Sequence, residues 1–153
     1  MLAPFFSVAL VLAIMGSGLM GGLFFAFSTA VMAALARLPA AQGADAMNAI
    51  NVVIVNPLFL AVFMGTAVLA LCLGVRAALG WSQPGSAWLL TGSLLYLVGV
   101  FGVTVVFNVP LNDTLAASND AGTWSRFLAD WVPWNHLRAL AGAGALLCYT
   151  LAR

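Results

Sequence analysis

The stretch VVIVNPLFLAVFMGTAVLALCLGV, residues 52–75, decides the fold class of this chain. It carries no charged side chain, and a helix needs about 20 mostly apolar residues to cross the hydrocarbon core of a bilayer. Only helices and closed barrels satisfy every backbone hydrogen bond in lipid. Because the sequence lacks short alternating strands, this stretch predicts a membrane-spanning helix.

The composition of the whole chain supports the same interpretation. Of 153 residues, 64% are apolar and 6% are charged, and there is no Lys or Glu. A soluble domain carries about a quarter charged residues. We expect membrane lipid to surround the protein. Because the formal net charge is only +1, no basic face is expected, and nucleic acid is not expected as a partner.

Apolar runs recur along the chain and predict an all-α, four-helix transmembrane bundle in a single domain, residues 1–153. A short extramembrane helical segment is expected between the third and fourth spans. The expected spans are residues 5–35, 52–77, 87–108 and 133–152.

The connections between these runs predict the topology. Residues 37–48 and 79–88 are expected to turn the chain, and Pro110 and Pro133 are expected to start helices, because proline suits the first helical turn. Four spans place both termini at one end and nearly all polar residues at the other. We expect an integral protein of a bacterial inner membrane, with both termini in the cytoplasm.

The polar end of this bundle contains the candidate site. The only histidine, His136, and Arg138 open the predicted fourth span, and ionisable groups in a span are costly unless they snorkel, pair or face a wet cavity. Two interpretations remain open for each: a site residue, or an interfacial group. The candidate catalytic residues are His136, Arg138, Asn108, Asn112 and Asn135.

Metal and nucleotide cofactors are not expected. One His, four Asp and no Glu cannot build the usual iron or zinc sites within one chain. The G-x-G-x-x-G pattern in GSGLMGG (16–22) lies within a span, where it lacks the strand-to-helix turn that binds a dinucleotide. We predict instead that Gly18 and Gly22 allow close helix packing.

Four blocks together resemble the anthrone oxygenase-like membrane family, long catalogued as a domain of unknown function: GGLFFAFSTAVMAAL (21–35), INVVIVNPLF (50–59), NVPLNDTL (108–115) and WVPWNHLR (131–138). The resemblance implies a small four-helix membrane protein. Some members are linked to oxidation of polyketide anthrones to anthraquinones.

Such a substrate makes a cofactor unnecessary, because a deprotonated anthrone can itself reduce O₂. His136 is expected to take the proton, and Arg138 to hold the oxyanion with help from nearby asparagines. A flat slot reached from lipid would bind the aromatic body. The candidate substrate-binding residues are Phe24, Phe25, Phe27, Asn56, Trp131 and Trp134.

The sequence thus favours a cofactor-independent oxygenase of a lipophilic anthrone-like or phenolic substrate that uses O₂. Two other classes stay open: a membrane protein that binds a small lipophile without chemistry, and an accessory subunit of a membrane complex. The glycine-rich helix faces also lead us to expect a homodimer.

Overall fold

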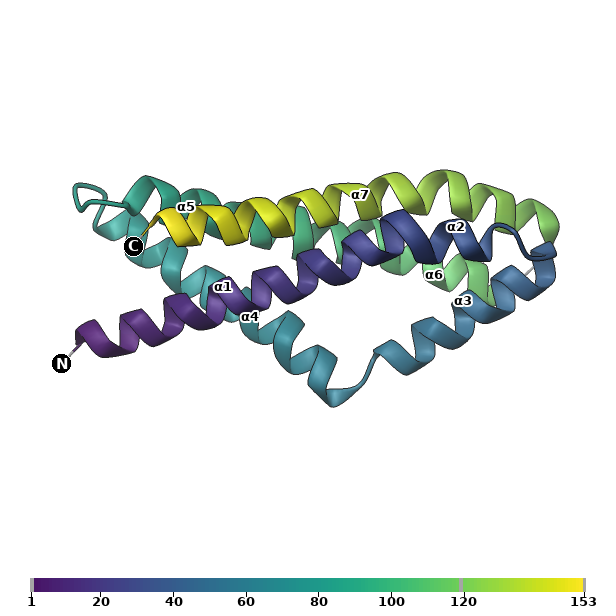
Figure 1. The fold of residues 1–153 in the computed structure, drawn as a ribbon, viewed down its shortest axis with the longest axis horizontal. Helices are drawn as coiled ribbons and strands as arrows, with labels where there is room; N and C mark the ends of the chain where they lie inside the picture. Colours follow the sequence, from purple (N-terminus) through teal and green to yellow (C-terminus); the bar gives the residue numbers. More distant parts are fainter. Residues whose placement is uncertain (1, 119, 153) are drawn as a thin grey trace.

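The computed structural model describes residues 2–118 and 120–152, and in this part of the chain the protein is all helical. Figure 1 shows an elongated bundle, with both termini and the turn after α4 at one end. The turn between α2 and α3 and the junction of α6 with α7 lie at the other end. This is the arrangement of connections that alternation of the apolar runs predicts.

The first helical rod runs through α1 (Leu2–Ala26), the π-helical η1 (Phe27–Val31) and α2 (Met32–Leu35). Residues 36–39 then turn the chain into α3 (Ala40–Ile54). The expected turn of residues 37–48 is therefore too long. Most of it is helical, because after Pro39 no residue interrupts the helix.

A sharp corner separates α3 from α4 (Pro57–Leu79), and Figure 1 shows it at the lower edge of the bundle. Val55 and Asn56 leave the helical conformation. The Asn56 Oδ1 atom accepts hydrogen bonds from the amides of Leu58 and Phe59 at 3.1 and 3.0 Å. Asn56 is thus an N-cap, with proline at the first helical position.

The next rod is continuous from Ser86 to Ala117 and comprises α5 (Ser86–Leu94), η2 (Leu95–Gly102), η3 (Thr104–Asn108) and α6 (Val109–Ala117). Pro110 lies within this rod, near the start of α6. The helical segment expected after the third span is therefore an extension of that span.

The last helix, α7, begins at Ala121 and ends at Leu151, so Pro133 lies inside it and the predicted helix start there is wrong. The cap is Asp120, whose carboxylate accepts hydrogen bonds from the Ser118 hydroxyl and from the amides of Gly122 and Thr123. These bonds, led by that of Ser118, hold the pKa of the Asp120 carboxyl well below its usual range.

Three helices in the described part of the chain are long and apolar enough to span a membrane: Phe5–Leu35, Pro57–Leu79 and Ser86–Ala117. The 23 residues of α4 extend about 35 Å, slightly more than the hydrocarbon core. α7 does not meet the same criterion. The fourth expected span therefore stays a prediction.

Close packing joins α1 to α7 through glycine. A Cβ on Gly142 would lie 2.7 Å from the Cα of Gly21, which leaves no room for a side chain between the two backbones. Gly18 faces the Leu146 side chain, whereas Gly22 has open space around it. Helix packing at this glycine segment was expected, but Gly21, not Gly22, provides the backbone contact.

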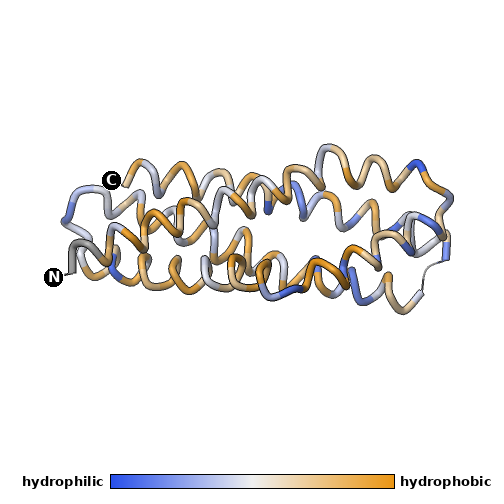
Figure 2. Tube along the Cα trace, turned by 60° about the horizontal axis from the view of Figure 1, so that its bottom comes forward, coloured by the Kyte–Doolittle hydropathy of each residue, from blue (hydrophilic) through white to orange (hydrophobic). Residues whose placement is uncertain are grey.

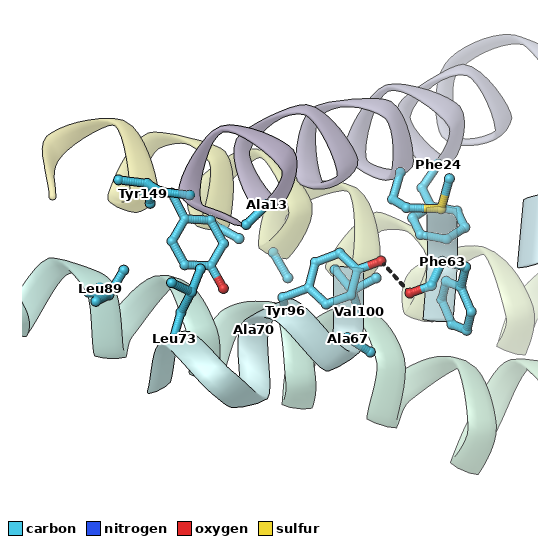
Figure 3. Close-up of a cluster of buried hydrophobic side chains, with 14 of the residues drawn as sticks. Ala13, Phe24, Phe63, Ala67, Ala70, Leu73, Leu89, Tyr96, Val100 and Tyr149 are labelled. Atoms are coloured by element: carbon cyan, nitrogen blue, oxygen red, sulfur yellow. Dashed lines mark hydrogen bonds between the residues drawn. The ribbon is translucent and has the colours of Figure 1, made fainter. Parts of the chain in front are cut away.

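Two apolar clusters divide the bundle. The first lies toward the termini and includes Tyr96, Val100 and Tyr149, with small alanines between the helices (Figure 3). The second lies at the other end and includes Trp124, Phe127 and Trp131. In Figure 2 hydrophilic segments appear at both ends and beside the middle of the bundle.

Candidate functional site

Arg138 is the centre of the candidate site. Its side chain is 5% exposed although it carries a guanidinium group. Nη2 donates a hydrogen bond to Asn135 Oδ1 at 2.7 Å, and Nη1 donates one to Thr104 Oγ1 at 3.3 Å. Both partners are neutral. The charge is therefore buried without a compensating anion from either of them, which is costly in free energy.

Two aromatic rings cover the guanidinium. Its central carbon lies 4.2 Å from the centre of the Phe24 ring and 5.0 Å from that of Trp131. Such cation–π contacts contribute about 2 kcal/mol or more when desolvated. They fix the plane of the group and reduce its desolvation penalty, but they do not neutralise its charge.

Asn135 holds this arrangement in place. It is fully buried, and its Nδ2 donates to the Phe24 carbonyl and to Ser28 Oγ, both at 2.8 Å. Since its Oδ1 accepts from Arg138, the amide ties α7 to the first rod and orients the guanidinium. Asn135 and Arg138 can cooperate because residues three apart share a helix face.

A cavity of about 120 Å³ lies beside Arg138. It is bordered by the first rod, α3, the start of α4, η3, α6 and α7. Its polar lining consists of Asn51, Thr104, Asn112, Trp131 and Arg138. Its apolar lining includes Leu23, Phe24, Phe27, Met47, Ile50, Ile54 and Phe59. The result is a small aromatic chamber with one cationic wall.

Several polar atoms of this lining have no hydrogen-bond partner within the described residues. The donors are Arg138 Nε, Trp131 Nε1 and Asn51 Nδ2, and the acceptor is Asn112 Oδ1. Buried polar atoms in proteins are nearly always paired, because each unpaired one costs about 1–3 kcal/mol. Three residues that line one cavity each carry an unpaired buried donor, one of them on a cation, and this favours a ligand that accepts hydrogen bonds and carries negative charge.

Several residues predicted from the sequence meet here. Arg138, Asn112, Trp131, Phe24 and Phe27 line the cavity. Asn108 and Trp134 are close in sequence to these residues, but neither is part of the lining. Asn108 is fully buried and donates to the Trp131 carbonyl at 3.4 Å, and Trp134 stacks on Phe107 with ring centres 3.7 Å apart.

Three predicted residues lie elsewhere. His136 is exposed and does not line the cavity, because its position two residues before Arg138 places it on another face of α7. Phe25 is 62% exposed, because consecutive residues of a helix lie on different faces and its neighbour Phe24 is the buried one. Asn56 caps α4 and borders a neighbouring groove. The expectation that His136 and Asn56 share the cavity with Arg138 is wrong.

Sequence reasoning missed two polar residues of the site. Neither Asn51 nor Thr104 was among the residues predicted for the site. The signal for Asn51 was available, because it lies four residues after Met47 in what proves to be one helix, and both line the cavity. Thr104 carried no comparable signal.

A larger open cavity of about 720 Å³ lies near the termini, beside Arg76 and Phe6. Arg76 is exposed, with its guanidinium carbon 4.4 Å from the centre of the Phe6 ring. None of the unpaired buried atoms belongs to the lining of this cavity. Size alone therefore does not make it the better candidate.

A family model described as anthrone oxygenase matches residues 58–148, more than half of the chain. The matched segment contains Thr104, Asn112, Trp131 and Arg138, whereas the cavity residues of α1 and α3 precede it. No curated protein and no solved structure gives a significant match to the chain.

Proposed function

Because the chain belongs to the anthrone oxygenase family, we propose that it is a membrane enzyme that oxidises a lipophilic anthrone-like or phenolic substrate with O₂. The single observation that carries the proposal is the buried Arg138 guanidinium. It is paired only with neutral groups, and it lines an aromatic cavity beside the unpaired Trp131 Nε1 donor. Such a wall stabilises an oxyanion.

The proposed enzyme has four spans, with α7 as the fourth. Its second half, from Ala139 to Leu151, is apolar and packs against α1, α5 and η2. The first half carries Arg126, Asp130 and the site residues, which lower its mean hydropathy. A polar residue inside a span is a functional residue by default, so the weaker apolar character of α7 accords with a site built on it.

The proposed reaction converts a methylene group flanked by aromatic rings into a carbonyl. The substrate first loses a proton from this carbon, and the negative charge moves to its conjugated oxygen. Arg138 Nε and Trp131 Nε1 donate hydrogen bonds to that oxygen. The carbanion then reduces O₂, and the overall change is CH₂ plus O₂ to C=O plus H₂O, which needs no further reductant.

The proton acceptor is not among the residues that line the cavity. No His or carboxylate belongs to the lining, and His136 is exposed. We therefore infer that the substrate loses its proton to water at the membrane interface, and that Arg138 lowers the free energy of the resulting anion on binding. The chain supplies no metal cofactor in this scheme.

The same observation favours a second candidate function. A cavity that holds an anion but has no base in its lining also suits a protein that binds a lipophilic anion without transforming it. Binder and enzyme would share Arg138 and the aromatic walls. They differ only in whether O₂ is consumed.

Oxygen uptake by the protein in nanodiscs, with an anthrone as substrate, tests the proposal. We expect Arg138→Gln to lower the rate by about 100- to 1,000-fold, which corresponds to the loss of an oxyanion donor. Arg76→Gln is the matched control, because that guanidinium also covers a phenyl ring but lies far from the cavity.

Chelator treatment should leave the rate unchanged. Absence of oxygen uptake by the intact protein, together with saturable binding of the anion, would support the binder. Equal rates for the Arg138 and Arg76 variants would remove Arg138 from the reaction.

A further inference from the structure

The cavity beside Arg138 is too small for an anthrone-like substrate of three fused rings. Its volume is about 120 Å³, and an engineered apolar cavity of about 150 Å³ holds a single benzene molecule. One ring at most lies in the cavity, with its oxygen at Arg138, and three fused rings do not fit. The rest of such a ligand must lie outside this chamber.

An adjacent groove provides the space. It measures about 470 Å³ and is lined by Phe27, Ala49, Ile50, Val53, Ile54 and Asn56. Three of these residues, Phe27, Ile50 and Ile54, also line the cavity. They form the wall between the two spaces, and each is only partly buried.

The groove opens at a surface suited to lipid. Around the corner between α3 and α4, exposed apolar side chains include Val52, 77% exposed, Val53, 73% exposed, and Leu58, 76% exposed. Neighbouring apolar side chains exposed in this way mark a surface that contacts a membrane or another apolar partner. A lipophile dissolved in the bilayer can therefore reach the groove sideways.

The wall itself is built on a helix end. Ile50 and Ile54 belong to the last turns of α3, which ends at Ile54, and Val55 is no longer helical. Asn56 Nδ2 donates to the carbonyls of Val53 and Ile54 at 3.1 and 3.3 Å, so side-chain bonds partly replace the missing backbone bonds there. Helix ends open more readily than helix centres.

We propose that the cavity and the groove form one two-part binding site for an elongated flat lipophile with an anionic oxygen on a terminal ring, as in an anthrone that carries a phenolic hydroxyl on an outer ring. The oxygen binds Arg138 and Trp131, and the apolar body passes Phe27, Ile50 and Ile54 to lie in the groove against α3. This inference rests on the proposed function in placing the anionic oxygen at Arg138 and in taking a ligand of more than one ring.

Binding of non-reactive carboxylates of increasing length tests this site. Benzoate, 2-naphthoate and anthracene-2-carboxylate carry one, two and three rings, stay ionised at neutral pH and need no turnover. Equilibrium dialysis against nanodiscs with and without the protein separates binding to the protein from partition into lipid. For the intact protein, the affinity corrected for partition should rise with each ring, by about tenfold from one ring to three.

Two tryptophan substitutions on α3 separate the groove from the cavity. Ala49→Trp fills the groove, because Ala49 lines the groove and not the cavity, and we expect it to lower the affinity for anthracene-2-carboxylate by about tenfold while the affinity for benzoate changes by less than about twofold. Val52→Trp is the matched control, because Val52 is exposed and lines neither space. Arg138→Gln should weaken all three ligands alike.

The outcomes distinguish this inference from the proposed function. Equal affinity for one and three rings, or equal losses of three-ring affinity in the Ala49 and Val52 variants, would overturn the two-part site even if oxygen uptake is normal. The expected pattern of binding without oxygen uptake would instead overturn the enzyme and keep the two-part site. Circular dichroism and size-exclusion profiles check that each variant is folded.

Discussion

The two ends of the bundle differ in whether their buried polar side-chain atoms have hydrogen-bond partners. Toward the termini, the Tyr96 hydroxyl donates to the Phe63 carbonyl at 3.0 Å, as Figure 3 shows. The Tyr149 hydroxyl donates to Ser93 Oγ at 3.3 Å, and Ser93 in turn donates to the Leu89 carbonyl at 2.9 Å. These polar groups serve as cross-links in an otherwise apolar interior.

At the opposite end the pattern reverses. Seven buried side-chain atoms lack a partner in the described residues, and only Ser17 Oγ lies toward the termini. The other six belong to Asn48, Asn51, Asn108, Asn112, Trp131 and Arg138. The packed end optimises stability, whereas the polar end keeps hydrogen-bonding capacity unused, which is what a binding site requires.

The largest effect on stability is expected at the packed end. Gly142→Val places a side chain against the backbone of Gly21, which cannot move aside without separating α1 from α7. We expect a loss of about 3 kcal/mol or more, measured by thermal unfolding in detergent. Gly22→Val is the control, because open space surrounds that position; similar losses for both would contradict the packing described here.

At the polar end we expect a substitution to raise the free energy of unfolding instead of lowering it. Arg138→Met removes a buried charge that is paired only with neutral groups and keeps a long side chain between Phe24 and Trp131. We expect a gain of about 1–2 kcal/mol in the free energy of unfolding, limited because Asn135 Oδ1 loses its donor. A marked loss of stability would mean that the guanidinium is structural, not functional.

Trp131→Phe separates the contribution of packing from that of hydrogen bonding within a single side chain. The substitution keeps an aromatic ring in the second apolar cluster but removes the unpaired Nε1 donor. We expect the unfolding temperature to change little and affinity for an anionic ligand to fall by about tenfold, typical of one hydrogen bond to a charged group. Unchanged affinity with equilibrium dialysis would exclude the indole from the site.

The smallest effect is expected for His136→Ala. The residue is close to the site in sequence but exposed and outside the cavity lining. The free energy of unfolding should stay within about 0.5 kcal/mol of that of the intact protein. The activation free energy calculated from the rate of oxygen uptake should change by no more than this. A loss of oxygen uptake restored by added imidazole would show that His136 takes the proton after all.

The sequence predicted the helical class, the apolar runs and the polar end well, because hydropathy and alternation of direction act over many residues. It misplaced the helix boundaries. Pro133 resembled a helix start, yet Asp120 caps α7 more than ten residues earlier, and the chain absorbs the proline inside the helix. Residues 40–48 resembled a turn, but nothing in them prevents helix formation.

Residue types at the site were easier to predict than their orientation. Arg138, Asn135, Trp131 and Phe24 were correctly grouped, because an ionisable group inside an apolar helix requires partners. His136 was misplaced although its spacing from Arg138 carried the signal, because two residues of a helix that are two positions apart lie about 200° apart around its axis wherever the helix starts. Contacts across helices, such as Thr104 with Arg138, follow from packing that a single sequence does not reveal.

The π-helical segments of the rods have a consequence for how this protein can change. Phe27 belongs to η1 and Thr104 to η3, so both segments border the cavity. A π turn closes over one residue more than an α turn. Deleting one residue between Thr104 and Asn108 would restore a regular turn, and because the wide turn accommodates the extra residue locally, the following residues would keep their direction. Asn112 would therefore stay in the cavity wall. A single-codon deletion in this segment can thus change the geometry around Thr104 while the rest of the rod keeps the same faces toward the ligand and the membrane.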